Sequence, residues 1–65
     1  MKVNFSENLK MLRLQNNVTQ QDIAKLCKTT TATVSRWENG VNEPDIYNLI
    51  LLADYFEITI DELVK

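Results

Sequence analysis

The 65-residue sequence contains no histidine and only one each of cysteine, glycine and proline. A single cysteine cannot form an intramolecular disulfide, and without histidine beside it there is no plausible set of zinc ligands. We therefore expect no metal and no cofactor. Carboxylates are scattered over polar positions and no histidine accompanies them, so nothing indicates a catalytic site or a small-molecule ligand, and the protein is not expected to be an enzyme.

Long apolar runs are also missing. None approaches the ~20 residues that a membrane-spanning helix requires, and the chain is polar from its N-terminus, so neither a membrane span nor a signal peptide is predicted. We expect a soluble, cytoplasmic protein with no membrane partner. A chain of 65 residues has room for one domain, which would cover residues 1–65.

Charge is divided unevenly along the chain. Residues 1–41 hold six basic and three acidic side chains, whereas residues 42–65 hold one basic and six acidic ones. The net charge of −2 therefore hides a basic first part and an acidic second part. This asymmetry is compatible with a basic face that meets a polyanion, and equally with ordinary solvated surface.

Apolar residues recur at helical spacing and no useful segment alternates between apolar and polar, so the predicted fold class is all-α. The predicted helices cover about 5–15, 20–26, 30–38, 46–56 and a short stretch after Thr59. Cap residues mark the start of each one. The predicted N-caps are Thr19, Thr30 and Asp45, together with two capping boxes, Asn4 with Glu7 and Thr59 with Glu62.

The stretch TTTATVSRWENG, residues 29–40, forms the most unusual of these helices. On a helical wheel Thr30, Val34 and Trp37 share one side, which we expect to face the core. The opposite side carries Thr31, Ala32, Ser35 and Arg36. A purely structural surface helix more often carries lysine and glutamate there, so short side chains with one arginine indicate close contact with a partner.

Several further residues form a recognisable pattern with this helix. They are Leu9, Leu12, Arg13, Thr19-Gln20, Ile23-Ala24, the run VSRWE at 34–38, Gly40, Pro44, Ala53 and the run DEL at 61–63. With this pattern, residues 18–64 resemble the helix-turn-helix domain of the Cro and phage-repressor type, also known as XRE-like. The resemblance implies a compact five-helix, lambda-repressor-like domain with its motif at about 19–39. It also implies sequence-specific binding to double-stranded DNA, usually as a dimer on a palindromic operator.

The resemblance also implies roles for individual residues, with residues 30–38 as the recognition helix in the major groove. The base-facing positions would be Thr31, Ala32, Ser35 and Arg36, of which the arginine suits a bidentate contact to guanine. The phosphate-facing positions would be Gln20, Lys28, Thr33 and Asn39. Arg13 and Glu38 would form a partly buried ion pair that positions the recognition helix, while Trp37 and Cys27 are expected in the core.

The sequence departs from the family pattern in the turn before residue 30. Lys28 stands where the family usually has glycine, which predicts a non-glycine residue in or near the left-handed region, and Thr29 replaces a buried aliphatic residue. After Gly40 the residues are Val41, Asn42 and Glu43 rather than basic ones. We therefore expect a single domain to bind DNA weakly and with strong salt dependence, which makes a dimer nearly necessary.

The apolar segment at 46–56 carries two stripes. Its predicted core side contains Ile46, Leu49, Leu52, Ala53 and Phe56, and a second stripe at i, i+4 and i+8 contains Tyr47, Leu51 and Tyr55. A second apolar stripe on a small domain usually marks a contact surface, so these three residues are the predicted dimer interface. The alternative is that a C-terminal segment outside this sequence covers them.

Two functions remain open at this point. The first is a transcriptional regulator, most commonly a repressor, of a phage, a mobile element or a bacterial operon. The second is a DNA-binding antitoxin or a restriction-modification controller, in which the same surface, or a further C-terminal region, binds a protein partner. Neither the operator nor the direction of regulation follows from the sequence, because small polar side chains contact several bases.

Overall fold

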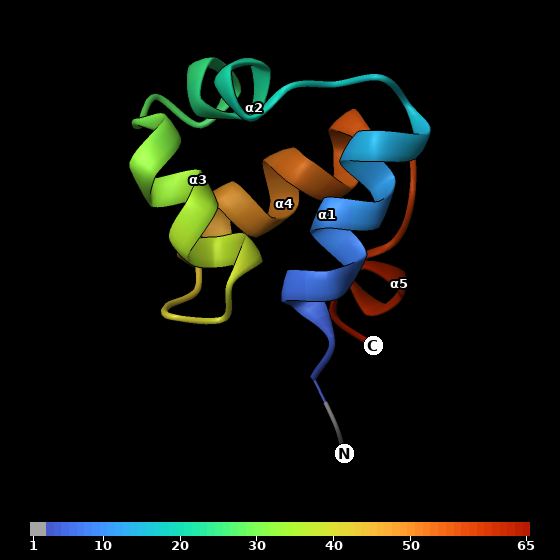
Figure 1. The fold of residues 1–65 in the computed structure, drawn as a ribbon. Helices are drawn as coiled ribbons and strands as arrows, with labels where there is room; N and C mark the ends of the chain where they lie inside the picture. The colour runs from blue at the N-terminus through green and yellow to red at the C-terminus, as the bar shows by residue number, and fades with distance from the viewer. Residues whose placement is uncertain (1–2) are drawn as a thin grey trace.

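The computed structural model describes residues 3–65, and in that range the chain forms five α-helices and no strand (Figure 1). The helices are α1 (Phe5–Gln15), α2 (Gln20–Leu26), α3 (Thr31–Glu38), α4 (Ile46–Tyr55) and α5 (Ile60–Val64). The all-α prediction is confirmed. The predicted bounds hold to within one residue, because the periodicity and cap signals that set them are local.

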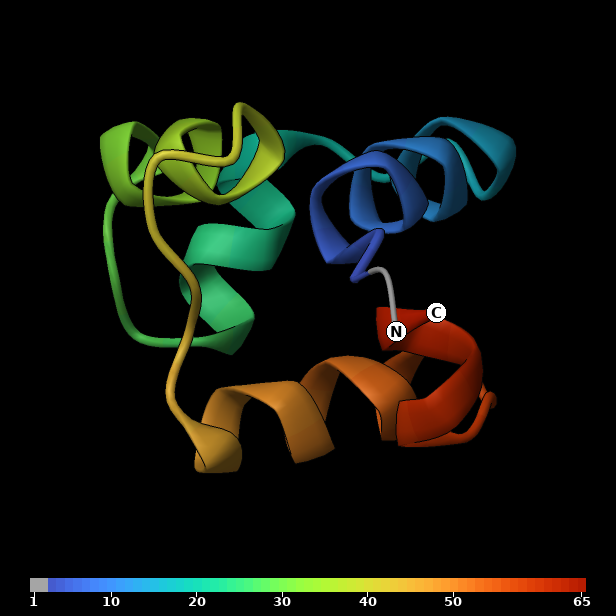
Figure 2. The same ribbon diagram turned by 90° about the horizontal axis from the view of Figure 1, so that it is seen from below.

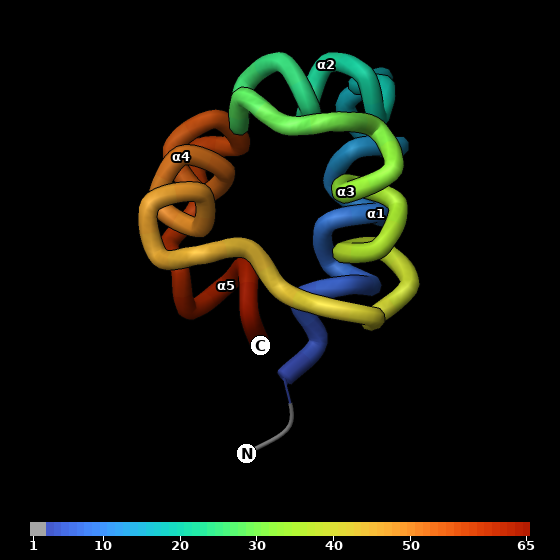
Figure 3. Tube along the Cα trace, turned by 90° about the vertical axis from the view of Figure 1, so that its left-hand side faces the viewer, coloured from blue at the N-terminus to red at the C-terminus, as the bar shows by residue number. Residues whose placement is uncertain are grey.

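The helices are arranged around one apolar interior. α1 and α3 lie side by side and α4 and α5 form the opposite side, while α2 crosses between them at one end (Figures 2 and 3). α3 packs against α1 and α2, and α5 packs against α1 and α4. The two ends of the described range meet, since the Asn4 N–H donates to the Val64 carbonyl at 2.8 Å.

Side-chain caps begin four of the five helices, as predicted. Thr19, Thr30, Asp45 and Thr59 each accept a hydrogen bond from a backbone N–H in the first turn. The predicted capping box of Asn4 and Glu7 is wrong. Asn4 precedes α1 without a side-chain cap bond, because its amide donates instead to the Lys65 carbonyl at 2.8 Å.

α1 to α4 all end in the same Schellman motif, in which one residue past the helix adopts positive φ. Those residues are Asn17, Lys28, Gly40 and Glu57, with φ of 56°, 55°, 73° and 57°. At the end of α2, for example, the N–H of Thr29 donates to the Ala24 carbonyl at 2.9 Å. The prediction of a non-glycine residue in this region at Lys28 is confirmed. With one glycine in the chain, three of these four turns use an ordinary side chain where glycine is most common.

The buried core takes residues from every helix. Its members are Phe5, Leu9, Ile23, Ala24, Cys27, Val34, Trp37, Leu52, Ala53 and Leu63. The core positions predicted for Cys27 and Trp37 are confirmed, and burial, followed by the nearby charge of Asp45, raises the pKa of the Cys27 thiol. Within residues 3–65, no helix is long and apolar enough to cross a membrane.

The apolar residues of α4 are divided between the core and the surface differently from the prediction. The helical wheel places Ile46 in the core, yet its side chain is 58% exposed. It is the first residue of α4, at the end of the helix that lies far from α5 (Figure 2). The predicted exposure of the second stripe is confirmed, with Tyr47 at 78%, and Ile50 is also exposed beside it.

Lys28 provides a test of how much the glycine-poor turns cost. Lys28→Gly is expected to be more stable than Lys28→Ala by about 0.5–1 kcal/mol. A side chain at positive φ costs roughly 1–2 kcal/mol, and the greater unfolded-state entropy of glycine offsets about half of that gain. Both variants lose the same charge, so urea denaturation of the pair isolates the backbone effect. Equal stabilities of the two variants would contradict a cost of positive φ at this position.

Candidate nucleic-acid interface

The segment from α2 to α3 is built by local signals on both sides of a short turn. Thr19 and Asp22 form a capping box at the start of α2, with both hydrogen bonds at 3.0 Å. The backbone N–H of Thr19 is the main cause that lowers the pKa of the Asp22 carboxyl. After the Schellman turn at Lys28, the hydroxyl of Thr30 accepts from the Thr33 N–H at 3.2 Å and starts α3. The result is two short helices packed against each other across a turn.

The face of α3 opposite the core carries the residues predicted to meet bases. Thr31, Ala32 and Arg36 are exposed and Ser35 is half-buried, whereas Val34 and Trp37 on the other side are buried. The helical wheel is therefore confirmed for all of these side chains. The prediction that Thr30 faces the core is wrong: Thr30 is exposed, because as the N-cap it lies outside the helix.

Basic side chains near this face are not neutralised by the protein. In the described range 3–65 the ion pairs join Arg13 to Glu38 and Lys65 to Asp61. Arg36 at the surface of α3 and Lys28 in the turn are both exposed. Since no carboxylate pairs with them there, both remain available to an anionic partner.

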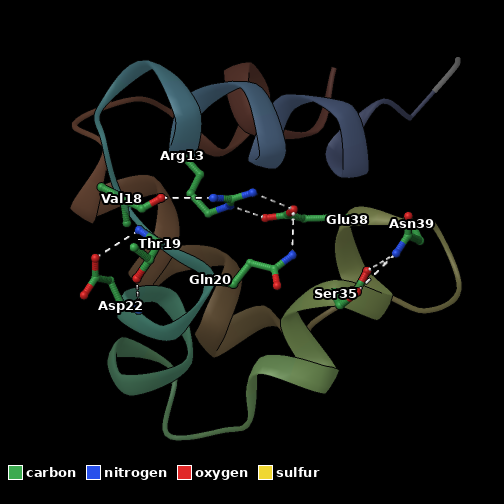
Figure 4. A network of polar contacts seen from close by, with 8 residues as sticks. All are labelled: Arg13, Val18, Thr19, Gln20, Asp22, Ser35, Glu38 and Asn39. Carbon is green, nitrogen blue, oxygen red and sulfur yellow. Dashed lines mark hydrogen bonds and ion pairs between the residues drawn. The ribbon is translucent and has the colours of Figure 1, made fainter.

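Glu38 joins three helices at the end of α3 (Figure 4). Its carboxylate accepts from Arg13 Nε at 2.7 Å, from Arg13 Nη2 at 3.2 Å and from Gln20 Nε2 at 3.2 Å. The Glu38 side chain is only 4% exposed and that of Arg13 13%. The predicted ion pair is confirmed, and Arg13 Nη1 also donates to the Val18 carbonyl at 3.1 Å, which holds the connection between α1 and α2.

Two amides predicted to meet phosphates form hydrogen bonds with other residues of the protein (Figure 4). Gln20 uses its amide nitrogen on Glu38, and Asn39 uses its own on Ser35, at 2.8 Å from the carbonyl and 3.2 Å from the hydroxyl. The i, i+4 spacing of Ser35 and Asn39 is a sequence signal for the second contact. No such signal points to the first, because Gln20 and Glu38 are 18 positions apart.

The other two residues predicted to contact phosphates are Lys28 and Thr33. Lys28 is exposed, and Thr33 is half-buried with its hydroxyl 3.1 Å from that of Thr30. In the described part of the chain, no three acidic or cysteine side chains gather in a way that would hold a metal ion.

The family model described as "Helix-turn-helix" matches residues 9–63, which is most of the chain. The chain belongs to this helix-turn-helix family. The resemblance to the Cro and phage-repressor type is thereby confirmed, and so is the DNA-binding, transcription-regulator class of the domain. The matched relatives are named as HTH-type transcriptional regulators, which agrees with the prediction that this domain is not an enzyme.

Two of the proteins similar to this helix-turn-helix domain come from Enterococcus faecalis and Listeria innocua. The "HTH-type transcriptional activator BcrR" of Enterococcus faecalis is 34% identical over 61 residues, which are 94% of this chain and 30% of that protein. A transcriptional regulator from Listeria innocua is 41% identical with a TM-score of 0.95, and the match covers 98% of this chain and 60% of that one. Both relatives are therefore substantially longer than this chain.

A third similar structure is nearly the same length. The restriction-modification controller protein C.AhdI from Aeromonas hydrophila is 27% identical with a TM-score of 0.78. The match covers 91% of this chain and 89% of that one. The five-helix, lambda-repressor-like fold is therefore shared by regulators of different overall length.

The Glu38 cluster predicts a large effect of a single substitution. Glu38→Ala is expected to lower the free energy of unfolding by about 3 kcal/mol, because it leaves the guanidinium of Arg13 largely buried without its partner. Thermal melting measures this, and DNA affinity should fall as well. Asp61→Ala is the control: it breaks the exposed pair with Lys65 and should change stability by less than about 0.5 kcal/mol. Similar melting of the two variants would contradict the role of Glu38.

Proposed function

We propose that the helix-turn-helix domain binds a specific sequence of double-stranded DNA, with α3 in the major groove and α2 across the backbone. The observation that carries this proposal is the outer face of α3, where short side chains surround an arginine that has no acidic partner in the described range. Short side chains let the helix backbone lie close to the bases. The cluster around Glu38 holds the helix at a fixed angle to the rest of the protein.

The chemistry of that face suggests which bases it contacts. Arg36 is suited to a bidentate contact with O6 and N7 of guanine, the most common specific pairing. The methyl groups of Thr31 and Ala32 suit the methyl group of thymine, and the hydroxyl of Ser35 forms a hydrogen bond with a base edge. In this proposal Arg36 provides most of the discrimination.

Phosphate contacts fix the position of the domain but carry no sequence information. We assign Lys28 and Thr33 to this role. Gln20 has a second amide hydrogen that is not used by Glu38, and we assign this hydrogen to a phosphate beside α2. The phosphate contact predicted for Asn39 stays a prediction, and it requires the amide to leave Ser35.

Arg36 and Lys28 should behave differently when replaced. Arg36→Ala is expected to cost about 1–3 kcal/mol of binding and to relax the preference at one base position, whereas Lys28→Ala should weaken all sequences similarly and lower the salt slope by about 1. Selection of bound sequences from random DNA, followed by titration at several salt concentrations, measures both. Lys65→Ala, just after α5, is the matched control and should leave the motif unchanged. If Arg36→Ala weakens binding to all DNA sequences equally, Arg36 does not recognise a base.

The domain is proposed to act as a two-fold dimer through the outer stripe of α4. Tyr47, Leu51 and Tyr55 are 78%, 41% and 47% exposed, and Ile46 and Ile50 extend the same apolar surface. A dimer doubles the phosphate contacts of a domain whose residues after Gly40 are not basic. Two-fold symmetry would place the α3 helices about one DNA turn apart, roughly 34 Å, on a palindromic operator.

Leu51 tests this interface directly. Leu51→Asp is expected to shift the protein to a monomer in sedimentation experiments and to weaken operator binding by at least about tenfold, because it places a charge in an apolar contact. Glu57→Asp, outside the stripe, is the control and should leave both measurements unchanged. A wild-type protein that is monomeric at high concentration, with operator binding unaffected by Leu51→Asp, would refute this interface.

We further propose that the regulator represses transcription in the cytoplasm of a bacterium, for a phage, a mobile element or a chromosomal operon. A dimer on a promoter excludes the polymerase by occupying the same DNA, which needs no further domain. The likeness to a restriction-modification controller supports a second candidate, in which the domain is a controller or an antitoxin and α4 contacts a protein partner. Co-purification from the native host distinguishes them, since only the second candidate retains a stoichiometric partner.

A further inference from the structure

The exposed side chains of α4 are arranged symmetrically about the middle of the helix, which lies at the edge of the fold (Figure 2). Positions 46 and 55, 47 and 54, and 50 and 51 are each equally far from the point between Ile50 and Leu51. The pattern is therefore the same when the helix is read in the opposite direction. The members of this exposed face are Ile46, Tyr47, Ile50, Leu51, Asp54 and Tyr55, and the other residues of α4 are buried or half-buried.

One member of the exposed face is charged. At about 100° per residue, Asp54 lies between Ile50 and Tyr47 around the helix, so it is inside the apolar surface and not at its border. Within residues 3–65 its carboxylate takes part in no ion pair or hydrogen bond. The hydroxyl of Tyr47, whose side chain is 78% exposed, likewise has no hydrogen bond in that range. The exposed face thus contains an acceptor and, at the matching position, a donor.

This match matters when the exposed face is covered, because a carboxylate that leaves water needs a hydrogen-bond donor. In a two-fold contact between antiparallel helices, each contact occurs twice with the two chains exchanged, so Tyr47 of each copy lies opposite Asp54 of the other. Ile50 and Leu51 then meet at the centre. Parallel packing would instead place each residue opposite itself and bring two Asp54 carboxylates together, which repel each other.

We propose that the exposed face of α4 binds a second copy of the chain in the antiparallel direction, and that Tyr47 of each copy donates its hydroxyl hydrogen to the Asp54 carboxylate of the other. The two-fold axis passes between Ile50 and Leu51. Each dimer contains the hydrogen bond twice, and the two Asp54 residues are separated by roughly 10 Å along the helices. This inference rests on the proposed dimer and deepens it, because it names the residues that set the direction and register of the two helices.

Three substitutions at exposed positions measure the hydrogen bond through the dimer dissociation constant, determined by sedimentation. Tyr47→Phe removes only a hydroxyl and is expected to raise the constant at least about tenfold, because two bonds to a charged group are lost. In the Asp54→Ala background the same substitution should change the constant less than about twofold. Tyr55→Phe is the matched control: it removes a hydroxyl that lies opposite Ile46, so it should also change the constant less than about twofold. Circular dichroism verifies that each variant is folded.

Mixing two variants tests whether the bond crosses between copies. A dimer of two Tyr47→Phe chains lacks the bond, and so does a dimer of two Asp54→Ala chains. A mixed dimer regains one bond, so native mass spectrometry should show it about threefold more stable than the average of the two parent dimers. In the control mixture both chains carry Tyr47→Phe and only one carries Asp54→Ala. There this excess should disappear, which separates the bond from repulsion between carboxylates.

Three results would overturn the inference. If Tyr47→Phe has the same effect with and without Asp54, the hydroxyl does not act through the carboxylate. If the mixed dimer shows no excess over the control mixture, Tyr47 and Asp54 do not face each other across the two-fold axis. In both cases dissociation of the dimer by Leu51→Asp would leave the proposed interface intact. If the wild type stays monomeric and binds only a different protein through this face, the proposed dimer and the pairing both fail, and DNA binding by α3 is unaffected.

Discussion

The carboxylate of Glu38 is the contact on which the orientation of α3 depends. It accepts from Arg13 on α1 and from Gln20 on α2, so three helices meet at one side chain. A buried carboxylate is unfavourable unless it is paired and hydrogen-bonded, and this one is. α3 has only eight residues, too few to be stable alone, so its geometry has to come from such tertiary contacts.

The same contact also matters for the charge near the proposed DNA surface. Glu38 ends a helix whose outer face is proposed to meet a polyanion, and at a helix C-terminus a carboxylate is unfavourable to the helix dipole. Pairing with Arg13 removes its charge from that surface. Along the chain, the acidic residues concentrate in 42–65, which form α4, α5 and the loop leading to α4 from α3; α4 and α5 lie on the side away from α3 (Figure 3). The acidic helices α4 and α5 and the proposed DNA-contacting helix α3 therefore lie on different sides of the fold.

The turns of the protein show how a chain with one glycine forms four tight helix ends. Asn17, Lys28 and Glu57 adopt positive φ, and the hydrogen bonds of each Schellman motif hold them there. Each turn carries some strain, but an ordinary residue also has less unfolded-state entropy to lose than glycine does. Between α2 and α3 this gives a short, defined turn, and the spacing of the two helices does not depend on a flexible residue.

Local signals in the sequence determined the five helices, four of their N-caps and the inward and outward faces of α3. These features follow from periodicity and from side chains within three or four positions of each other, which is why both faces of residues 30–38 can be assigned from the sequence alone. The tertiary structure decided three other features. The amide of Asn4 turns to Lys65, that of Gln20 turns to Glu38, and Ile46 lies exposed. Each depends on which distant segment lies beside the residue, or on the absence of one, and no pattern within a single helix contains that information.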